Sequence, residues 1–184
     1  MEFCLHYYGK LKSRDNAAGK HSIRQALNSQ IKSLCDSQPF VQAFKDTKGN
    51  LKKGKKQLYI EHGKKRYWFM ISEYLKTVVD LDITILVPHE VGRIVQNGGD
   101  IDNRIKTLFD ALRVPSVQDE IPTSDSFDYS NGGMYCLLED DKLINRVSIR
   151  SYQDHDPIDD DSVKCIIQAQ TRITAALLGN LCFV

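Results

Sequence analysis

Residues 98–112 read Gly-Gly-Asp-Ile-Asp-Asn-Arg-Ile-Lys-Thr-Leu-Phe-Asp-Ala-Leu, and they predict an amphipathic helix that begins after a Gly-Gly turn. The apolar residues recur at i, i+4, i+7, i+8 and i+11, so they form one stripe of Ile101, Ile105, Leu108, Phe109 and Leu112. A separate polar arc carries Asp102, Asn103, Lys106 and Asp110. Asp100 lies where the N-cap is expected, and Asp102 lies in the first turn.

Two explanations fit Asp100 and Asp102. As a cap and a first-turn acid they stabilise the helix, the cap by about 0.5–2 kcal/mol, and Asp102 with Lys106 makes an i,i+4 ion pair worth about 0.3–0.5 kcal/mol. As paired carboxylates they bind Mg²⁺, a hard cation that prefers the oxygens of carboxylates and phosphates. The two explanations are compatible, because a helix N-terminus favours the ionised carboxylate that a metal ligand must be.

A second acidic block follows later in the chain. Residues 134–138 are an apolar run that predicts a buried strand, and residues 139–141 are three acids in a row. Residues 142–150 then alternate well enough to predict a returning strand. The acidic turn is either a solvated turn or a position for catalytic carboxylates, and the earlier block favours the second explanation.

Together the two blocks resemble the core of the RusA family, through Asp100-x-Asp102-Asn103-x-x-Lys106-x-x-x-Asp110-Ala111-Leu112 and then Asp140-Asp141. Members of that family are small, homodimeric, Mg²⁺-dependent endonucleases of mixed α/β fold that resolve Holliday junctions. The resemblance implies that the metal ligands are Asp100, Asp102 and Asp141, and that these acids are catalytic together with Lys106. It implies supporting roles for Asn103, Asp110 and Asp140, although Asp110 is also explained as a plain helix salt-bridge acid.

The resemblance implies hydrolysis of DNA phosphodiester bonds by metal-activated water, with Mg²⁺ or Mn²⁺ as the cofactor. In the reaction that the resemblance implies, Lys106 would stabilise charge on the phosphate or orient the water. The chain is longer than a typical member of the family, and it also departs from the family in two places. The gap between the blocks, residues 113–133, is longer than in the family and is rich in Asp, Ser, Pro and Gly, so it predicts an inserted surface loop. The segment 9–14 replaces the family's basic, proline-containing segment.

Other metal and nucleotide sites are not favoured. The residue at the next ligand position after Asp102 is Arg104, which excludes an EF-hand loop. The five cysteines contain no close pair, no histidine pair has zinc-ligand spacing, and there is no phosphate-binding loop.

Composition and length predict one soluble domain over residues 1–184. An odd number of scattered cysteines favours a reduced, cytoplasmic protein. The first residues lack the features of a signal peptide, and no apolar run approaches the roughly 20 residues of a membrane span, so no membrane partner is expected.

Positive charge is concentrated in one part of the chain, although the net charge is only +1. We expect this basic segment to contact phosphates, through Lys52, Lys53, Lys55, Lys56, Lys64, Lys65 and Arg66. Its other explanation is a solvated hairpin connection. The same segment motivates an alternative function, a non-catalytic nucleic-acid-binding module on the same fold. A third hypothesis is a protein interaction through the apolar residues 173–184.

The order of expected elements predicts an α+β fold with a mixed β-sheet flanked by a few helices, as in RusA. Strands are expected at 2–8, 57–60, 65–72, 77–87 and 162–169, and helices at 20–35 and 38–44 besides the motif helix. This order would bring Asp100, Asp102 and Asp141 to one edge of the sheet.

Overall fold

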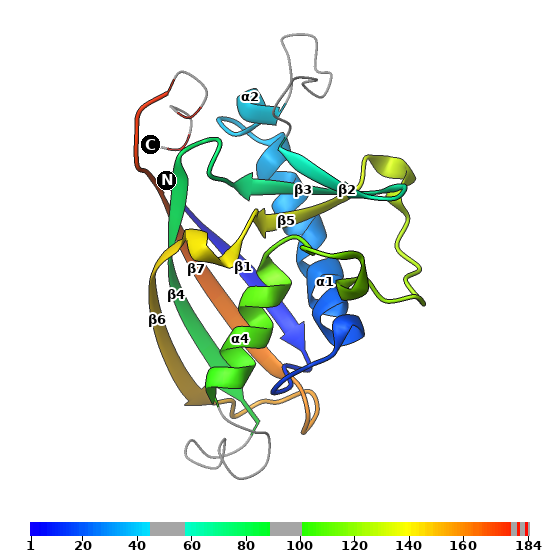
Figure 1. The fold of residues 1–184 in the computed structure, drawn as a ribbon. Coiled ribbons are helices and arrows are strands. Elements are labelled where there is room, and N and C mark those ends of the chain that lie inside the picture. Colours follow the sequence, from blue (N-terminus) through cyan, green and yellow to red (C-terminus); the bar gives the residue numbers. More distant parts are fainter. Residues whose placement is uncertain (45–57, 89–100, 178–179, 181–182, 184) are drawn as a thin grey trace.

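The computed structural model describes residues 1–44, 58–88, 101–177, 180 and 183. These residues form two mixed sheets with helices packed between and beside them, which confirms the α+β class (Figure 1). The prediction named one sheet, whereas the strands are divided into a four-stranded sheet, β1-β7-β4-β6, and a three-stranded sheet, β2-β3-β5. A period-2 pattern shows which face of a strand is buried but does not identify the neighbouring strand.

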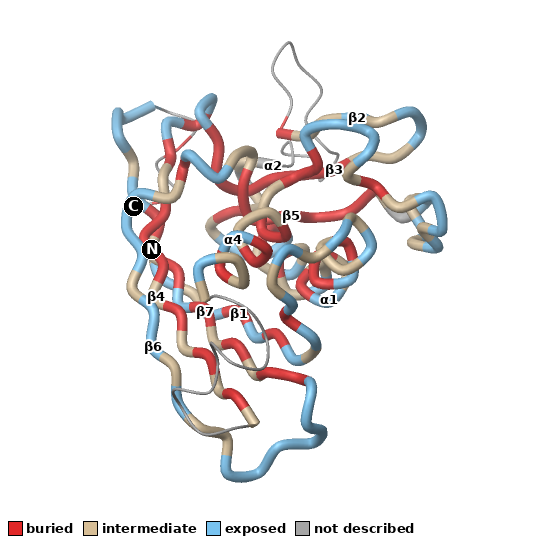
Figure 2. Tube along the Cα trace, turned by 60° about the horizontal axis from the view of Figure 1, so that its bottom comes forward, coloured by how far each residue is buried: buried red, intermediate tan, exposed pale blue. Residues whose placement is uncertain are grey.

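The four-stranded sheet contains β1 (Glu2–Gly9), β7 (Val163–Ile173), β4 (Thr77–Val87) and β6 (Ile144–Gln153). β7 is antiparallel to both β1 and β4, and β4 is parallel to β6. The alternation predicted for β4 places its apolar row on the inner face, where Val79, Leu81, Ile83, Ile85 and Val87 are buried. β6 is an edge strand and is largely exposed (Figure 2).

The three-stranded sheet contains β2 (Tyr59–His62), β3 (Lys65–Ile71) and β5 (Met134–Leu138). β2 and β3 form the expected antiparallel hairpin, and β3 is parallel to β5. All five residues of β5 are buried, as its continuous apolar sequence predicted. The acidic turn follows β5 and includes a short 3₁₀ helix, η3 (Asp141–Leu143), which leads directly into β6.

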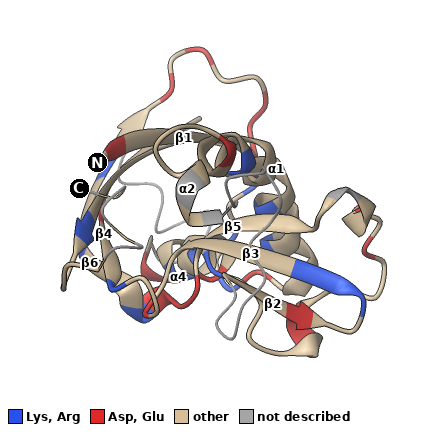
Figure 3. Ribbon diagram, turned by 90° about the horizontal axis from the view of Figure 1, so that it is seen from above, with Lys and Arg blue, Asp and Glu red and all other residues tan. Residues whose placement is uncertain are grey.

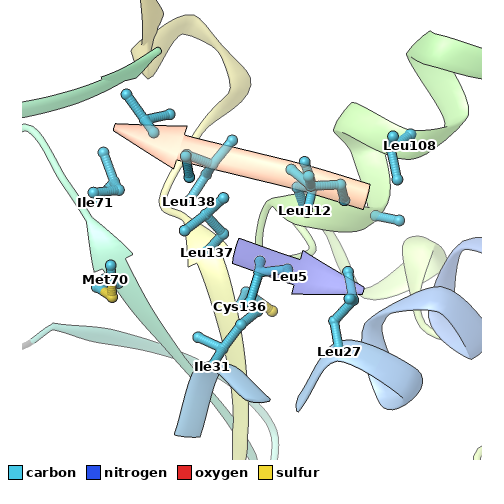
Figure 4. Close-up of a cluster of buried hydrophobic side chains, with 14 of the residues drawn as sticks. Leu5, Leu27, Ile31, Met70, Ile71, Leu108, Leu112, Cys136, Leu137 and Leu138 are labelled. Atoms are coloured by element: carbon cyan, nitrogen blue, oxygen red, sulfur yellow. The ribbon is translucent and has the colours of Figure 1, made fainter. Parts of the chain in front are cut away.

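The α-helices among the described residues are α1 (Ala17–Asp36), α2 (Val41–Phe44) and α4 (Ile101–Leu112). α1 begins three residues before the predicted start, at an N-cap formed by Asn16, whose side chain accepts a hydrogen bond from the Gly19 N–H. α1 packs against α4, β5 and β1. Leu108 and Leu112 of α4 point into the same cluster as Leu5 and Leu27 (Figure 4). Buried residues of both sheets therefore share one hydrophobic core.

The predicted inserted loop contains two short 3₁₀ helices, η1 (Gln118–Glu120) and η2 (Tyr129–Asn131), and is anchored by buried side chains such as Ile121. The apolar C-terminal segment is buried within the fold at Phe183, whose ring packs on that of Phe40 with centroids 4.9 Å apart. Within the described ranges, no helix combines the length and apolarity that crossing a membrane requires.

Candidate active site

A surface pocket of about 450 Å³ lies between α4, η3 and β6. Its charged residues are Asp102 and Lys106 from α4 and Asp141 from η3. Its apolar residues are Ile101, Ile105 and Phe109 from α4 and Ile149 from β6, and Ser151 completes the lining. The structure therefore brings Asp102, Lys106 and Asp141 to one place, beside the edge strand of the larger sheet. Asp100, the third predicted metal ligand, lies outside the described residues.

The orientation of α4 is fixed at its C-terminus by Arg24 of α1. The guanidinium is buried, and it donates hydrogen bonds to the backbone carbonyls of Asp110, at 2.6 Å, and Arg113, at 3.0 Å. These carbonyls have no partner inside the helix, so a cation there both satisfies them and opposes the negative end of the helix dipole. Burial lowers the pKa of Arg24. No local feature of the sequence indicated this contact.

Asp110 faces α1 and not the pocket. Its carboxylate pairs with Lys20 at 2.7 Å and with Arg113 at 3.4 Å. It therefore joins α4 to α1, as expected of a helix salt-bridge acid, and it supports the pocket only by holding the helix. Asn103 also lies outside the pocket lining, since its side-chain oxygen accepts a hydrogen bond from Arg14 at 3.4 Å.

Two of the three acids in the acidic turn accept hydrogen bonds from the backbone, and the third lines the pocket. Glu139 accepts a hydrogen bond from the Glu73 N–H at 2.9 Å. Asp140 is the N-cap of η3, and its carboxylate accepts a hydrogen bond from the Lys142 N–H at 3.0 Å. Lys142 in turn pairs with Glu73 at 2.8 Å. Asp140 thus supports the position of Asp141, which lines the pocket.

Asp102, Lys106 and Asp141 make no side-chain hydrogen bond or ion pair with any other residue in the described ranges. The i,i+4 ion pair that the spacing of Asp102 and Lys106 allows is not formed. These side chains are exposed and remain available to a ligand. Without this ion pair, the explanation of Lys106 as a helix-stabilising partner of Asp102 has no support among the described residues.

The donor set suits a hard divalent cation. Two exposed carboxylates on one pocket would repel a phosphate, and a cation bound by them would offset that repulsion. Among the described residues no group of three or more His, Cys, Asp and Glu side chains is close enough to hold a metal ion. The described part of the site therefore supplies two carboxylates.

The basic residues described on the β2–β3 hairpin are largely paired within the chain. Arg66 pairs with Glu61 at 2.8 Å and lies over the ring of Tyr59, and Lys65 pairs with Asp125 at 2.7 Å. Lys64 is exposed. The basic end of β3 lies at the right of Figure 3, apart from α4. Lys52, Lys53, Lys55 and Lys56 lie outside the described residues.

Asp125 anchors the inserted segment through a buried polar cluster that the sequence did not reveal. Its side chain is 0% exposed and accepts hydrogen bonds from Lys65, from the Tyr129 hydroxyl at 2.7 Å and from the Phe127 N–H at 3.0 Å. The His21 ring also contacts it, with Nε2 at 2.9 Å. Burial alone would raise the pKa of the Asp125 carboxyl, but these hydrogen bonds outweigh burial and lower the pKa to about 2.

No protein-family model, no curated protein and no solved structure matches this chain.

Proposed function

We propose that this chain is a divalent-metal-dependent endonuclease that hydrolyses phosphodiester bonds in DNA, with the pocket between α4, η3 and β6 as its active site. The observation that carries the proposal is that Asp102, Lys106 and Asp141 line one pocket, although the third of them comes from a different part of the chain. The likeness of the two sequence blocks to the RusA family supports the same function. It indicates branched DNA such as a Holliday junction as the substrate and a homodimer as the active assembly.

The carboxylates of Asp102 and Asp141, together with Asp100, would hold Mg²⁺ or Mn²⁺. When bound, the ion supplies a Lewis acid for the phosphate and the attacking water. Lys106 lies one helical turn beyond Asp102 and offers a positive charge to the phosphate as negative charge accumulates on it. Asp140 and Arg24 act from outside the pocket, because they set the positions of η3 and α4.

Purified protein is expected to cut a synthetic four-way junction, a flap or a duplex when Mg²⁺ is present and to stop when EDTA is added. Asp102→Asn should lose this cleavage, whereas Asp119→Asn, an exposed acid on η1, should keep it. If clean wild-type protein cuts no nucleic acid with any divalent metal, the hydrolytic proposal fails. Binding that persists without cleavage would favour the alternative, a non-catalytic nucleic-acid-binding module.

The basic segment has its own test. Replacing Lys52, Lys53, Lys55 and Lys56 with alanine should weaken DNA binding and flatten its salt dependence, by about 0.9 in the log–log slope for each phosphate that the protein no longer neutralises. Arg66→Ala should change the slope less, because this guanidinium is already paired with Glu61. Affinity measured by fluorescence anisotropy between low and moderate salt gives the slope. An unchanged slope in the quadruple variant would remove the segment from the DNA interface.

A further inference from the structure

The candidate active site has two chemically different sides. Asp102, Lys106 and Asp141 form a charged side suited to a metal ion and a phosphate. The other side is apolar. It is formed by three residues spaced four apart along α4, Ile101, Ile105 and Phe109, and by Ile149 of β6. Hydrolysis of a phosphodiester would use the charged side, but it does not explain the apolar side.

We propose that the apolar side is a binding site for one unpaired nucleobase, which belongs to the nucleotide whose phosphate lies at the charged side. This inference rests on the proposed nuclease function, and it names the kind of DNA that the site selects.

The apolar side is accessible to solvent except at Ile105, which is buried. Ile149 is 37% exposed, and Phe109 and Ile101 are only partly buried. Because apolar surface is more stable when removed from water, a wall of this kind beside a charged group indicates a ligand that covers it. The strand β6 that carries Ile149 lies at the edge of its sheet, and its residues are exposed or only partly buried (Figure 2).

A nucleotide has both of the chemical parts that the pocket accommodates. Its phosphate is an anion, and its base is a flat group that stacks on aromatic rings or packs on apolar side chains. The volume of about 450 Å³ lies in the usual range for ligand pockets. Ser151 also lines the pocket, and its hydroxyl is buried without a hydrogen-bond partner within the described part of the chain.

The proposal has a consequence for substrate choice. In a continuous duplex each base is paired and stacked, and extruding it costs free energy. Bases at a branch point, in a flap or in a single strand do not carry this cost. The pocket should therefore favour cleavage next to an unpaired nucleotide over cleavage within a perfect duplex.

The test compares two flap substrates that differ only at the nucleotide next to the scissile bond, which carries either its base or an abasic tetrahydrofuran residue. Under single-turnover conditions with Mg²⁺, wild-type protein should cut the abasic flap about 10-fold to 100-fold more slowly, as expected for the loss of one stacked base. Phe109→Leu keeps an apolar side chain but removes the ring, so the two rates should become nearly equal. Val147→Ala, a change on β6 outside the pocket lining, should preserve the difference.

A binding measurement separates this inference from the nuclease proposal. With Ca²⁺ in place of Mg²⁺, the fluorescence of a 2-aminopurine at the same position should be quenched on binding by wild-type protein and not by Phe109→Leu. Equal cutting of both flaps by wild-type protein would overturn the base site and leave the nuclease proposal standing. A specific quench without cutting would support the base site and reject the hydrolytic step. If wild-type protein sediments as a dimer and Ile149→Asp as a folded monomer, the apolar wall is a subunit interface, and the base site is wrong.

Discussion

Asp141→Asn is expected to abolish metal-dependent cleavage, with a rate loss on the order of 10³-fold or more. The double variant Asp102→Asn/Asp141→Asn should cut no more slowly than either single variant. The physical reason is that both carboxylates line one pocket and would hold the same ion, so that removing the first already removes the function of the second. Asparagine keeps the size of each side chain, which limits the effect on folding.

Single-turnover cleavage and calorimetric titration of Mn²⁺ measure the two sides of this prediction. Each single variant should weaken Mn²⁺ binding as well as cleavage. Asp160→Asn removes an exposed acid from the loop before β7 and serves as the matched control, since it should alter neither. Losses that multiply in the double variant would show that Asp102 and Asp141 act independently, and the shared ion would then be wrong.

Asp125→Ala is expected to lower the free energy of unfolding by about 3–5 kcal/mol, because it breaks a buried pair and leaves its partners unsatisfied. Lys65 loses its carboxylate, and the Phe127 N–H and the Tyr129 hydroxyl lose acceptors. Urea unfolding followed by tryptophan fluorescence measures the change. Glu61→Ala breaks the exposed pair with Arg66 and should cost only about 0–1 kcal/mol. Equal losses in the two variants would contradict the role of Asp125 as the anchor of the inserted segment.

The same cluster should make stability depend on pH in two ranges. The pKa of Asp125 is about 2 in the folded protein, below its ordinary 3.8, so its contribution is present above 3.8 and is lost as the pH falls toward 2. Burial lowers the pKa of His21 from its ordinary 6.5, more than Asp125 raises it. Below pH 6.5 the unfolded chain therefore binds a proton that the folded chain does not, and stability falls.

His21→Gln should remove the first part of this decline and keep the second. Urea midpoints measured from about pH 7 down to about pH 5 test the histidine, because only its titration falls in that interval for this cluster. A midpoint that declines equally in wild-type protein and His21→Gln would assign the pH dependence to other groups.

Local patterns predicted the elements that depend on local spacing. α4 ends at the last residue of the predicted apolar stripe. The stripe and the carboxylate in the first turn both lie within the twelve residues of the helix, so local spacing was enough to predict it. β4 has the predicted bounds because its apolar and polar residues alternate, and this alternation is typical of a strand with one buried face. The pairing of the two acidic blocks also came from sequence, through their combined pattern, and Asp102 and Asp141 line one pocket.

Contacts between distant elements could not be predicted in the same way. Lys65 resembles its neighbours in the basic segment, and only the fold shows that it pairs with a buried carboxylate. Arg24 lies on a helix whose apolar spacing predicts a buried face. The sequence does not show that its guanidinium donates hydrogen bonds to backbone carbonyls at the end of α4. Ser151 is one of several small polar residues on β6, and only the packing of α4 places it in a pocket.

Arg24 holds the last turn of α4 by two hydrogen bonds, so a residue outside the pocket would influence the proposed chemistry. A helix of twelve residues is a rod about 18 Å long. Pivoting it by about 10° at the clamped end would sweep Asp102 through roughly 3 Å, and misplacement of a reacting group by even about 1 Å can slow a reaction about 100-fold. Substitutions in the middle of α1 would therefore reduce the proposed activity without changing any residue that lines the pocket.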